Sequence, residues 1–221
     1  MKTATTQQDI LARAREYVRQ ELGEDFSGHD WWHIHRVSTT AKRLATECGA
    51  DAFVTELAAL LHDVGDYKLR GPSNEPESAI AQHWMEANGV GAEVVQHICG
   101  IIDSMSYKGA GVKSAMTTVE GQCVQDADRL DAIGAIGIAR TFAYAGAKKQ
   151  AMHDPELEPV MHQTVEEYRK AKTSSINHFH EKLLLLKDRM NTEPAKRLAQ
   201  ERHDYMVAFL EQFHAEWNGE R

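Results

Sequence analysis

Histidine and aspartate side chains at four positions of the chain could together bind a divalent metal ion. His62 and Asp63 are adjacent and directly follow the apolar residues 57–61. Neutral histidine nitrogen and aspartate oxygen are ordinary ligands of such ions, so an apolar helix that ends in this pair points to a bound metal. His33 precedes the pair and Asp128 follows it. Two nitrogens and two carboxylates would leave coordination positions open for water or a substrate oxygen, which is typical of a catalytic site.

The spacing of apolar residues predicts the elements that must position these side chains. Adjacent helical residues lie about 100° apart around the axis, so His62 and Asp63 can both reach an ion beyond the helix end. The other two ligands must come from neighbouring helices. Helices are predicted at 7–22, about 30–48, 76–88, 92–104, 160–190 and 193–217, with Gly49 ending the second of these. Another helix is predicted from an Asp51 cap to the His62-Asp63 pair, and residues 119–147 are expected to form a short helix or extended entry followed by an apolar helix. Loops are predicted at 65–76, 105–114 and 148–159.

The fold class that follows is all-α. No stretch of the chain alternates between apolar and polar residues with period two, and no internal repeat is present. We therefore expect a bundle of roughly ten helices in a single domain over residues 1–221. The metal-binding core is expected at about 26–147, with the helices of residues 159–217 packed on it and closing the pocket.

Charge and composition limit the classes of partner. With 25 basic and 33 acidic residues, the net charge of −8 argues against nucleic-acid polymers, which need a basic face. No apolar run approaches the roughly 18 residues of a membrane span, so no membrane partner is expected. Three cysteines without CxxC spacing and no signal peptide indicate reduced thiols in a cytoplasmic protein. A small phosphorylated substrate and a homodimer are both compatible with the sequence.

Four stretches of sequence resemble a known family. They are HDWWHIHRV from residue 29, LLHDVGDYK from residue 60, VQDADRLDAIGAIGIAR from residue 124 and SSINHFHEKLLLLKDRM from residue 174. In this order they resemble the HD-domain superfamily of metal-dependent phosphohydrolases, and within it the YedJ/YpgQ-like branch. The resemblance implies that His33, His62, Asp63 and Asp128 are the metal ligands. It favours Asp128 over Asp126 and Asp131 because Asp128 fills the family's A-D-x-L position.

The resemblance also implies a cofactor and a reaction. We expect one divalent ion, with Mn²⁺ preferred and Mg²⁺, Ni²⁺, Co²⁺, Zn²⁺ or Fe²⁺ compatible with the ligands. The branch implies hydrolysis of nucleoside or deoxynucleoside triphosphates to the monophosphate and pyrophosphate. Phosphomonoesterase or phosphodiesterase activity stays open, as does a non-catalytic, metal-bound nucleotide sensor. An oxygenase with two irons would need a second set of ligands.

Three further residues are candidates for catalysis. Asp66 lies one turn beyond Asp63 and could act as a general base or orient the nucleophile, or could pair with Lys68 in a loop. Arg36 follows His33 by three residues and could reach a phosphate or pair with a carboxylate. Lys68 could contact the phosphates, because substrate contacts gather on loops that contain glycine.

The candidates for substrate binding are four lysine or arginine side chains and one histidine. Each of the charged side chains could instead be a solvated surface charge. They are Lys108, Arg129 and Arg140, with the pair His178 and Lys182, which are four residues apart and could contact the leaving phosphates or the sugar.

Other residues were weighed as contacts of the metal site. Asp131 shares a helical face with Asp128 and could support it. His29 could be a further ligand or could hydrogen-bond locally at a helix start, and His83 and His97 could hold a second metal or be ordinary surface or core histidines.

Overall fold

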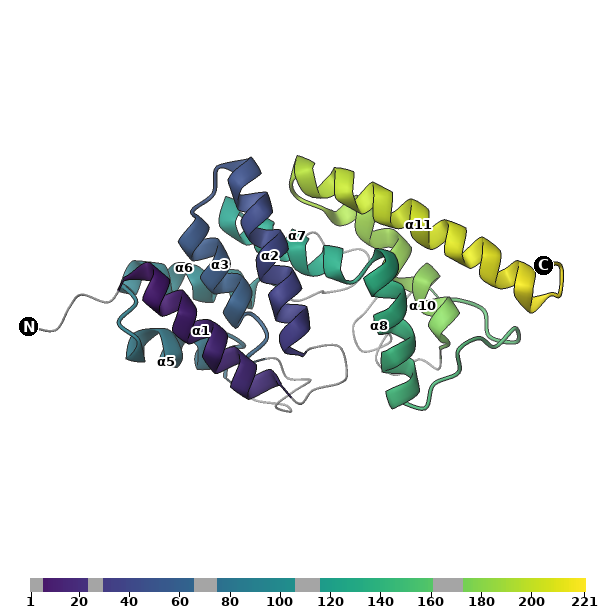
Figure 1. Cartoon of the computed structure of the whole chain (residues 1–221), viewed down its shortest axis with the longest axis horizontal. Helices are drawn as coiled ribbons and strands as arrows, with labels where there is room; N and C mark the ends of the chain where they lie inside the picture. The colour runs from purple at the N-terminus through teal and green to yellow at the C-terminus, as the bar shows by residue number, and fades with distance from the viewer. Residues whose placement is uncertain (1–5, 24–29, 66–74, 106–115, 161–172) are drawn as a thin grey trace, which may run out of the picture. The chain divides into compact units, whose positions relative to one another are not determined.

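The computed structural model describes residues 6–23, 30–65, 75–105, 116–160 and 173–221 (Figure 1). Within these ranges it contains nine α-helices and one 3₁₀ helix and no strand, so the all-α prediction is confirmed. None of the described helices is long and apolar enough to cross a bilayer. The predictions for His29, Asp66, Lys68 and Lys108 lie outside the described residues.

The chain divides into two compact units, and the division falls between Ala127 and Asp128, inside helix α7. The N-terminal unit is built from α1 (Gln7–Leu22), α2 (Trp31–Cys48), α3 (Ala52–Leu61), α5 (Ala79–Ala87), α6 (Ala92–Asp103) and the first part of α7 (Val119–Asp131). The C-terminal unit contains α8 (Gly134–Ala147), α10 (Ser175–Glu181), the 3₁₀ helix η1 (Leu183–Arg189) and α11 (Glu193–Trp217). The expected packing of residues 159–217 over the metal-binding core stays a prediction.

Helix α3 is the centre of the N-terminal unit. Every residue of α3 after Ala52 is buried, and α1, α2 and α6 pack around it. The predicted helix boundaries on either side are confirmed. Gly49 ends α2 in the left-handed conformation at φ 70°, which glycine adopts without strain, and the Asp51 side chain caps α3 by accepting a hydrogen bond from the Val54 N–H.

The C-terminal unit is held together by aromatic side chains from three helices. Phe179 of α10 stacks on Phe209 of α11 with ring centroids 5.8 Å apart, and Phe142 of α8 lies 6.0 to 6.3 Å from both. Aromatic pairs at these separations contribute about 0.5–1.5 kcal/mol beyond the area that they bury.

One predicted element is wrong. Residues 160–190 do not form a single helix, because α10 is capped by the Ser174 side chain and stops at Glu181. Lys182 then leaves the helical conformation, with φ −143° and ψ −56°, and the leucine run continues as a 3₁₀ helix. With three residues per turn, the 3₁₀ helix aligns Leu183 with Leu186, and these two leucines are the buried members of the run. Four successive leucines carry no periodicity that would separate the two kinds of helix.

Candidate metal centre

The candidate metal centre begins with His33, in the first turn of α2. Asp30 caps this helix, and its Oδ1 accepts a hydrogen bond of 2.8 Å from the backbone N–H of His33. The His33 side chain is fully buried. The cap therefore fixes both the start of α2 and the place from which the imidazole extends.

His62 is the C-terminal cap of α3, and its ring orientation is set by the backbone. Its Nδ1 lies 2.9 Å from the Ala59 carbonyl oxygen. A carbonyl only accepts hydrogen bonds, so Nδ1 carries the proton and Nε2 presents a lone pair. A backbone partner of this kind is the usual way in which a metal-binding histidine is held in one tautomer.

Asp63 lies between the two imidazoles. Its Oδ1 is 3.2 Å from Nε2 of His62, and its Oδ2 is 3.4 Å from Nε2 of His33. Two ligand atoms that each bind the same ion at roughly 2.1 Å, with an angle at the ion between the octahedral and the tetrahedral value, lie about 2.9–3.4 Å apart. Both separations therefore suit a shared ion. The Asp63 side chain is buried, where a bound cation would offset its charge.

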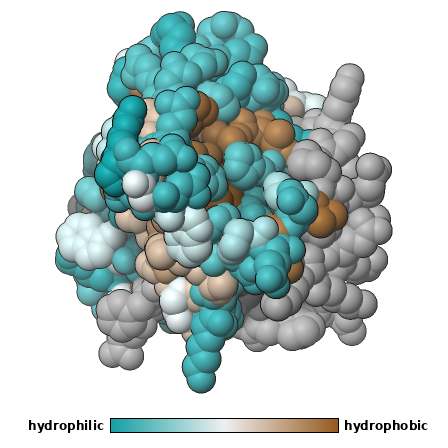
Figure 2. All heavy atoms as spheres, turned by 90° about the vertical axis from the view of Figure 1, so that its right-hand side faces the viewer, coloured by the Kyte–Doolittle hydropathy of each residue, from teal (hydrophilic) through white to brown (hydrophobic). Residues whose placement is uncertain are grey.

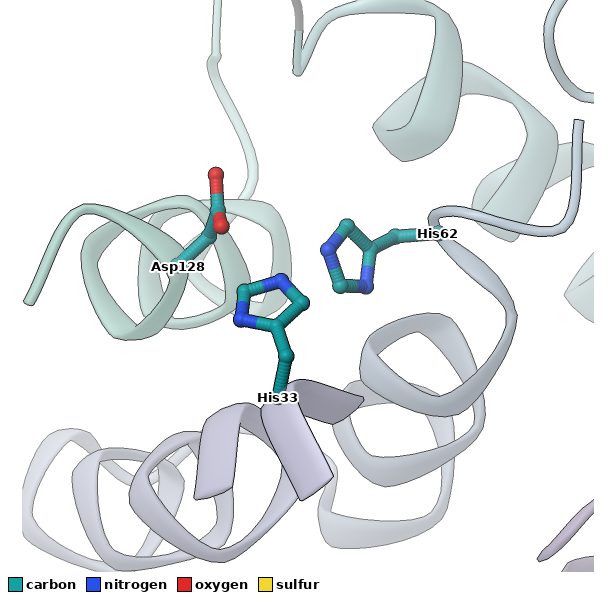
Figure 3. A group of neighbouring side chains, drawn as sticks. All are labelled: His33, His62 and Asp128. Carbon is teal, nitrogen blue, oxygen red and sulfur yellow. The ribbon is translucent and has the colours of Figure 1, made fainter. Parts of the chain in front are cut away.

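Asp128 is on α7, just beyond the point where the two compact units divide. One ligand atom each from His33, His62 and Asp128 lie within 4.8 Å of one another, and no other such group is present among the described residues. Figure 3 shows the two imidazoles directed toward each other from the ends of their helices, with the Asp128 carboxylate beside them. Three of the four ligands predicted from the sequence are thus brought together. Asp63, the fourth, is not a member of this group, although its oxygens lie near both imidazoles.

Asp131, the sequence alternative to Asp128, is engaged elsewhere. Its Oδ2 accepts a hydrogen bond of 2.8 Å from Nη1 of Arg140, and the Asp131 side chain is buried. Arg129, which precedes it, donates to the Arg189 carbonyl oxygen. Two of the proposed phosphate-binding arginines therefore have contacts within the C-terminal unit, and a guanidinium with five N–H groups can make further ones.

Arg36, His178 and Lys182 are the other catalytic and substrate-binding candidates within the described residues. Arg36 is half-buried on α2, one turn after His33. Lys182 is the C-terminal cap of α10, and its backbone N–H donates to the His178 carbonyl oxygen. Burial, and to a smaller extent the charge of Lys182, lowers the pKa of His178 to about 3, so this imidazole is neutral at pH 7.

The two histidines considered for a second metal do not join the centre. His83 is exposed on α5, and Nε2 of His97 on α6 lies 3.7 Å from Oε2 of Glu120. The sequence reasoning missed the Ala59 carbonyl, which orients His62. No sequence signal could have revealed it, because every residue carries a carbonyl.

Comparison with known proteins places this geometry in a family. The HD domain model matches residues 31–133, which include all four candidate ligands. The protein YpgQ of Bacillus subtilis is 40% identical over 90% of this chain and 89% of its own length. This chain belongs to the HD superfamily of metal-dependent phosphohydrolases. Its similarity to YpgQ places it in the YpgQ-like branch.

Solved structures of similar proteins agree with this fold. A crystal structure from Lactobacillus plantarum matches with a TM-score of 0.83 and 41% identity, over 99% of this chain and all of that chain. An HD-superfamily hydrolase from Bacillus thuringiensis matches with a TM-score of 0.75 and 45% identity, over 96% of this chain and 99% of its own. B. subtilis YpgQ in complex with ADP matches with a TM-score of 0.72 and 35% identity, over 93% of this chain and 97% of its own.

Proposed function

We propose that this hydrolase cleaves nucleoside or deoxynucleoside triphosphates to the monophosphate and pyrophosphate, with one divalent ion, preferably Mn²⁺, held by His33, His62, Asp63 and Asp128. The observation that carries the proposal is the convergence of ligand atoms from His33, His62 and Asp128 within 4.8 Å. The nucleotide class is supported by YpgQ, which was crystallised in complex with ADP.

The ligands' own contacts suit them to this task. A divalent ion held there would supply Lewis-acid chemistry toward a phosphate oxygen and would make a neighbouring water more acidic. His62 is held by the Ala59 carbonyl with Nε2 directed at the site. Asp63, with one oxygen near each imidazole, would add a negatively charged ligand beside both rings.

Other residues of the chain would bind and orient the triphosphate. Asp66 would accept the proton of the attacking water, and Lys68 and Lys108 would pair with phosphate oxygens. Arg36 lies on the same helical face as His33 and would contact the phosphate nearest the ligands. His178, neutral at pH 7, would contribute a hydrogen bond rather than a charge.

Three more cations complete the proposed substrate contacts. Lys182, one helical turn from His178, would contact the leaving pyrophosphate or the sugar. Arg129 and Arg140 would use guanidinium N–H groups beyond those that donate to the Arg189 carbonyl and to Asp131.

A nucleotide panel tests the reaction. The purified protein is incubated with each triphosphate in Mn²⁺, Mg²⁺, Co²⁺ or Ni²⁺, and phosphate is resolved from pyrophosphate by chromatography. We expect monophosphate and pyrophosphate in equal amounts. The double variant His62→Ala with Asp63→Ala should lose both bound Mn²⁺ and activity, whereas the variant His83→Ala, at an exposed position on α5, should keep both. Full activity of the metal-free double variant would refute the mechanism.

A second substrate class has its own support. The symmetrical bis(5'-nucleosyl)-tetraphosphatase of B. subtilis is 32% identical over 47% of this chain and 60% of its own length. Symmetrical cleavage of a bis(5'-adenosyl) tetraphosphate yields two molecules of ADP, the ligand seen in YpgQ. The panel therefore includes this dinucleotide, and faster release of nucleoside diphosphate from it than of pyrophosphate from any triphosphate would favour that activity. Tight nucleotide binding with no product would instead indicate a sensor.

A further inference from the structure

The C-terminal unit has a pocket that none of the proposed chemistry uses. Its volume is about 350 Å³. Figure 2 views the molecule from the end at which α11 terminates, where apolar side chains are visible between hydrophilic ones. The walls combine apolar residues, among them Pro155, Leu157 and Ile176, with three histidines, His153, His180 and His214. Three imidazoles around one small pocket point to a metal site, because histidine is the commonest protein ligand of transition metals.

The spacing of two of these imidazoles matches that of the candidate metal centre. The rings of His153 and His214 have centroids 5.5 Å apart and planes inclined by 78°. The rings of His33 and His62 are also 5.5 Å apart, with planes inclined by 63°. Two imidazoles that bind one ion at about 2.1 Å with a tetrahedral angle have centroids roughly 5 Å apart. The pair in the pocket is therefore separated as two ligands of one ion would be.

His153 also has an unsatisfied polar atom. Its Nδ1 is buried and has no hydrogen-bond partner among the described residues. A buried polar nitrogen without a partner costs about 1–3 kcal/mol, and coordination of an ion would remove that cost. The ring is held by edge-to-face contacts with Trp217, at 4.7 Å, and with Phe213, at 5.8 Å. These contacts limit its rotation, so the ring is already oriented in the absence of a ligand.

His180 is the third imidazole of the set. It lies on α10 with its side chain exposed, and it lines the same pocket as His153 and His214. The ligand atoms of the three histidines do not all lie within 4.8 Å, since only the His33 group meets that limit in the described part of the chain. Full coordination by all three thus requires at least one of these side chains to change its rotamer.

We propose that His153, His180 and His214 form a second metal site, selective for the transition ions Zn²⁺, Ni²⁺ and Cu²⁺. Imidazole nitrogen suits these ions, whereas Mg²⁺ and Mn²⁺ prefer oxygen and would find only Glu158 among the carboxylates of the lining. Because a side chain must move, this site binds more weakly than the centre at His33 and His62. It is independent of the proposed function.

The test counts bound ions in the full-length protein by titration and elemental analysis. With Ni²⁺ or Zn²⁺ we expect two ions per chain, and with Mn²⁺ one. In the double variant His153→Gln with His214→Gln the Ni²⁺ count should fall to one, while nucleotide hydrolysis in Mn²⁺ is unchanged. The control His203→Gln removes another α11 histidine whose Nδ1 is buried without a partner but which does not line the pocket, and it should retain both ions.

A second measurement covers failure of the double variant to fold. The variant His62→Ala with Asp63→Ala keeps the pocket intact and should still bind one Ni²⁺ but no Mn²⁺. One Ni²⁺ per wild-type chain, lost entirely in this variant, would overturn the proposal and would make the histidines part of the aromatic packing. Two Ni²⁺ per chain in the folded His153→Gln, His214→Gln variant would overturn it as well. Neither result bears on nucleotide hydrolysis, so the two proposals fail separately.

Discussion

Replacing Asp63 with asparagine tests the metal centre most directly. Asparagine keeps the size of the side chain but removes the charge that lies 3.2 Å from Nε2 of His62 and 3.4 Å from Nε2 of His33. Loss of groups that only support metal ligands costs roughly 10–100-fold in affinity, so loss of a direct ligand should cost at least about 100-fold. The Asp63→Asn variant should therefore bind Mn²⁺ at least that much more weakly.

The loss of affinity predicts a measurable change in thermal stability. An ion at a hundred times its Kd stabilises the folded state by about 2.7 kcal/mol, and 1 kcal/mol shifts the Tm of a domain this large by about 2–4 °C. Mn²⁺ at that concentration should raise the wild-type Tm by roughly 5–11 °C over the value with chelator. At the same concentration a hundredfold weaker site is only half saturated, which leaves about 0.4 kcal/mol and a shift of roughly 1–2 °C.

Each variant is measured by differential scanning fluorimetry, with chelator and with Mn²⁺, so that any effect on folding appears in the chelator arm. The control is Asp103→Asn on α6, whose carboxylate accepts hydrogen bonds from the backbone N–H and hydroxyl of Ser78. This control should lower the Tm in both arms and leave the metal-dependent shift unchanged. A full wild-type shift in Asp63→Asn would show that Asp63 is not a ligand, whatever its distance from the imidazoles.

Three further predictions follow from other contacts. Asp128→Asn should abolish the Mn²⁺-dependent Tm shift. Asp131→Asn should keep this shift but lower the Tm measured with chelator, because loss of its hydrogen bond to Arg140 costs about 1–3 kcal/mol. Equal Mn²⁺-dependent shifts in the two variants would contradict the ligand assignment. The pKa of His178 is lowered to about 3, so the folded state favours the neutral imidazole. Its contribution to the free energy of unfolding is therefore full above pH 6.5 and falls at lower pH, by on the order of 2 kcal/mol at pH 5. The unfolding free energies of wild type and His178→Gln, measured by urea melts, should diverge between pH 6.5 and pH 5, and parallel pH profiles would exclude the effect. Burial raises the pKa of Cys123 to about 12, so iodoacetamide at pH 8 should label Cys123 only in denaturant, as read by peptide mass spectrometry, and rapid labelling of the folded protein would contradict its burial.

The caps and periodic helices could be predicted from the sequence because their signals are local. Asp51 and Gly49 stand at the start of α3 and the end of α2, where side-chain capping and a positive φ demand those residue types. The break at Lys182 could not be predicted, since it depends on which leucines the C-terminal unit buries. In the 3₁₀ turn of three residues Leu183 and Leu186 lie directly above one another and are both buried.

The candidate site shows the same division between local and non-local information. The residue types of His33, His62 and Asp128 made them candidates, because histidine and aspartate are common metal ligands. With 12 histidines and 33 acidic residues in the chain, residue type alone could not select them. The resemblance chose Asp128 over Asp131, and the pairing of Asp131 with Arg140 agrees with that choice. The way in which Asp63 places one oxygen near each imidazole depends on the angle at which the end of α3 meets α2, which no sequence spacing encodes.

The position of His62 at the end of α3 explains why Asp63 rather than His62 is the better residue to change. A carbonyl in the last turn of a helix lacks an N–H partner from the helix, and the imidazole of His62 supplies one to Ala59. The same hydrogen bond that completes the helix end therefore fixes the tautomer and direction of the ring. Removing the imidazole would leave a buried carbonyl unsatisfied at a cost of about 1–3 kcal/mol and would remove a ligand at the same time. Asp63→Asn leaves the His62–Ala59 contact intact, so its effect on metal binding can be separated from its effect on folding.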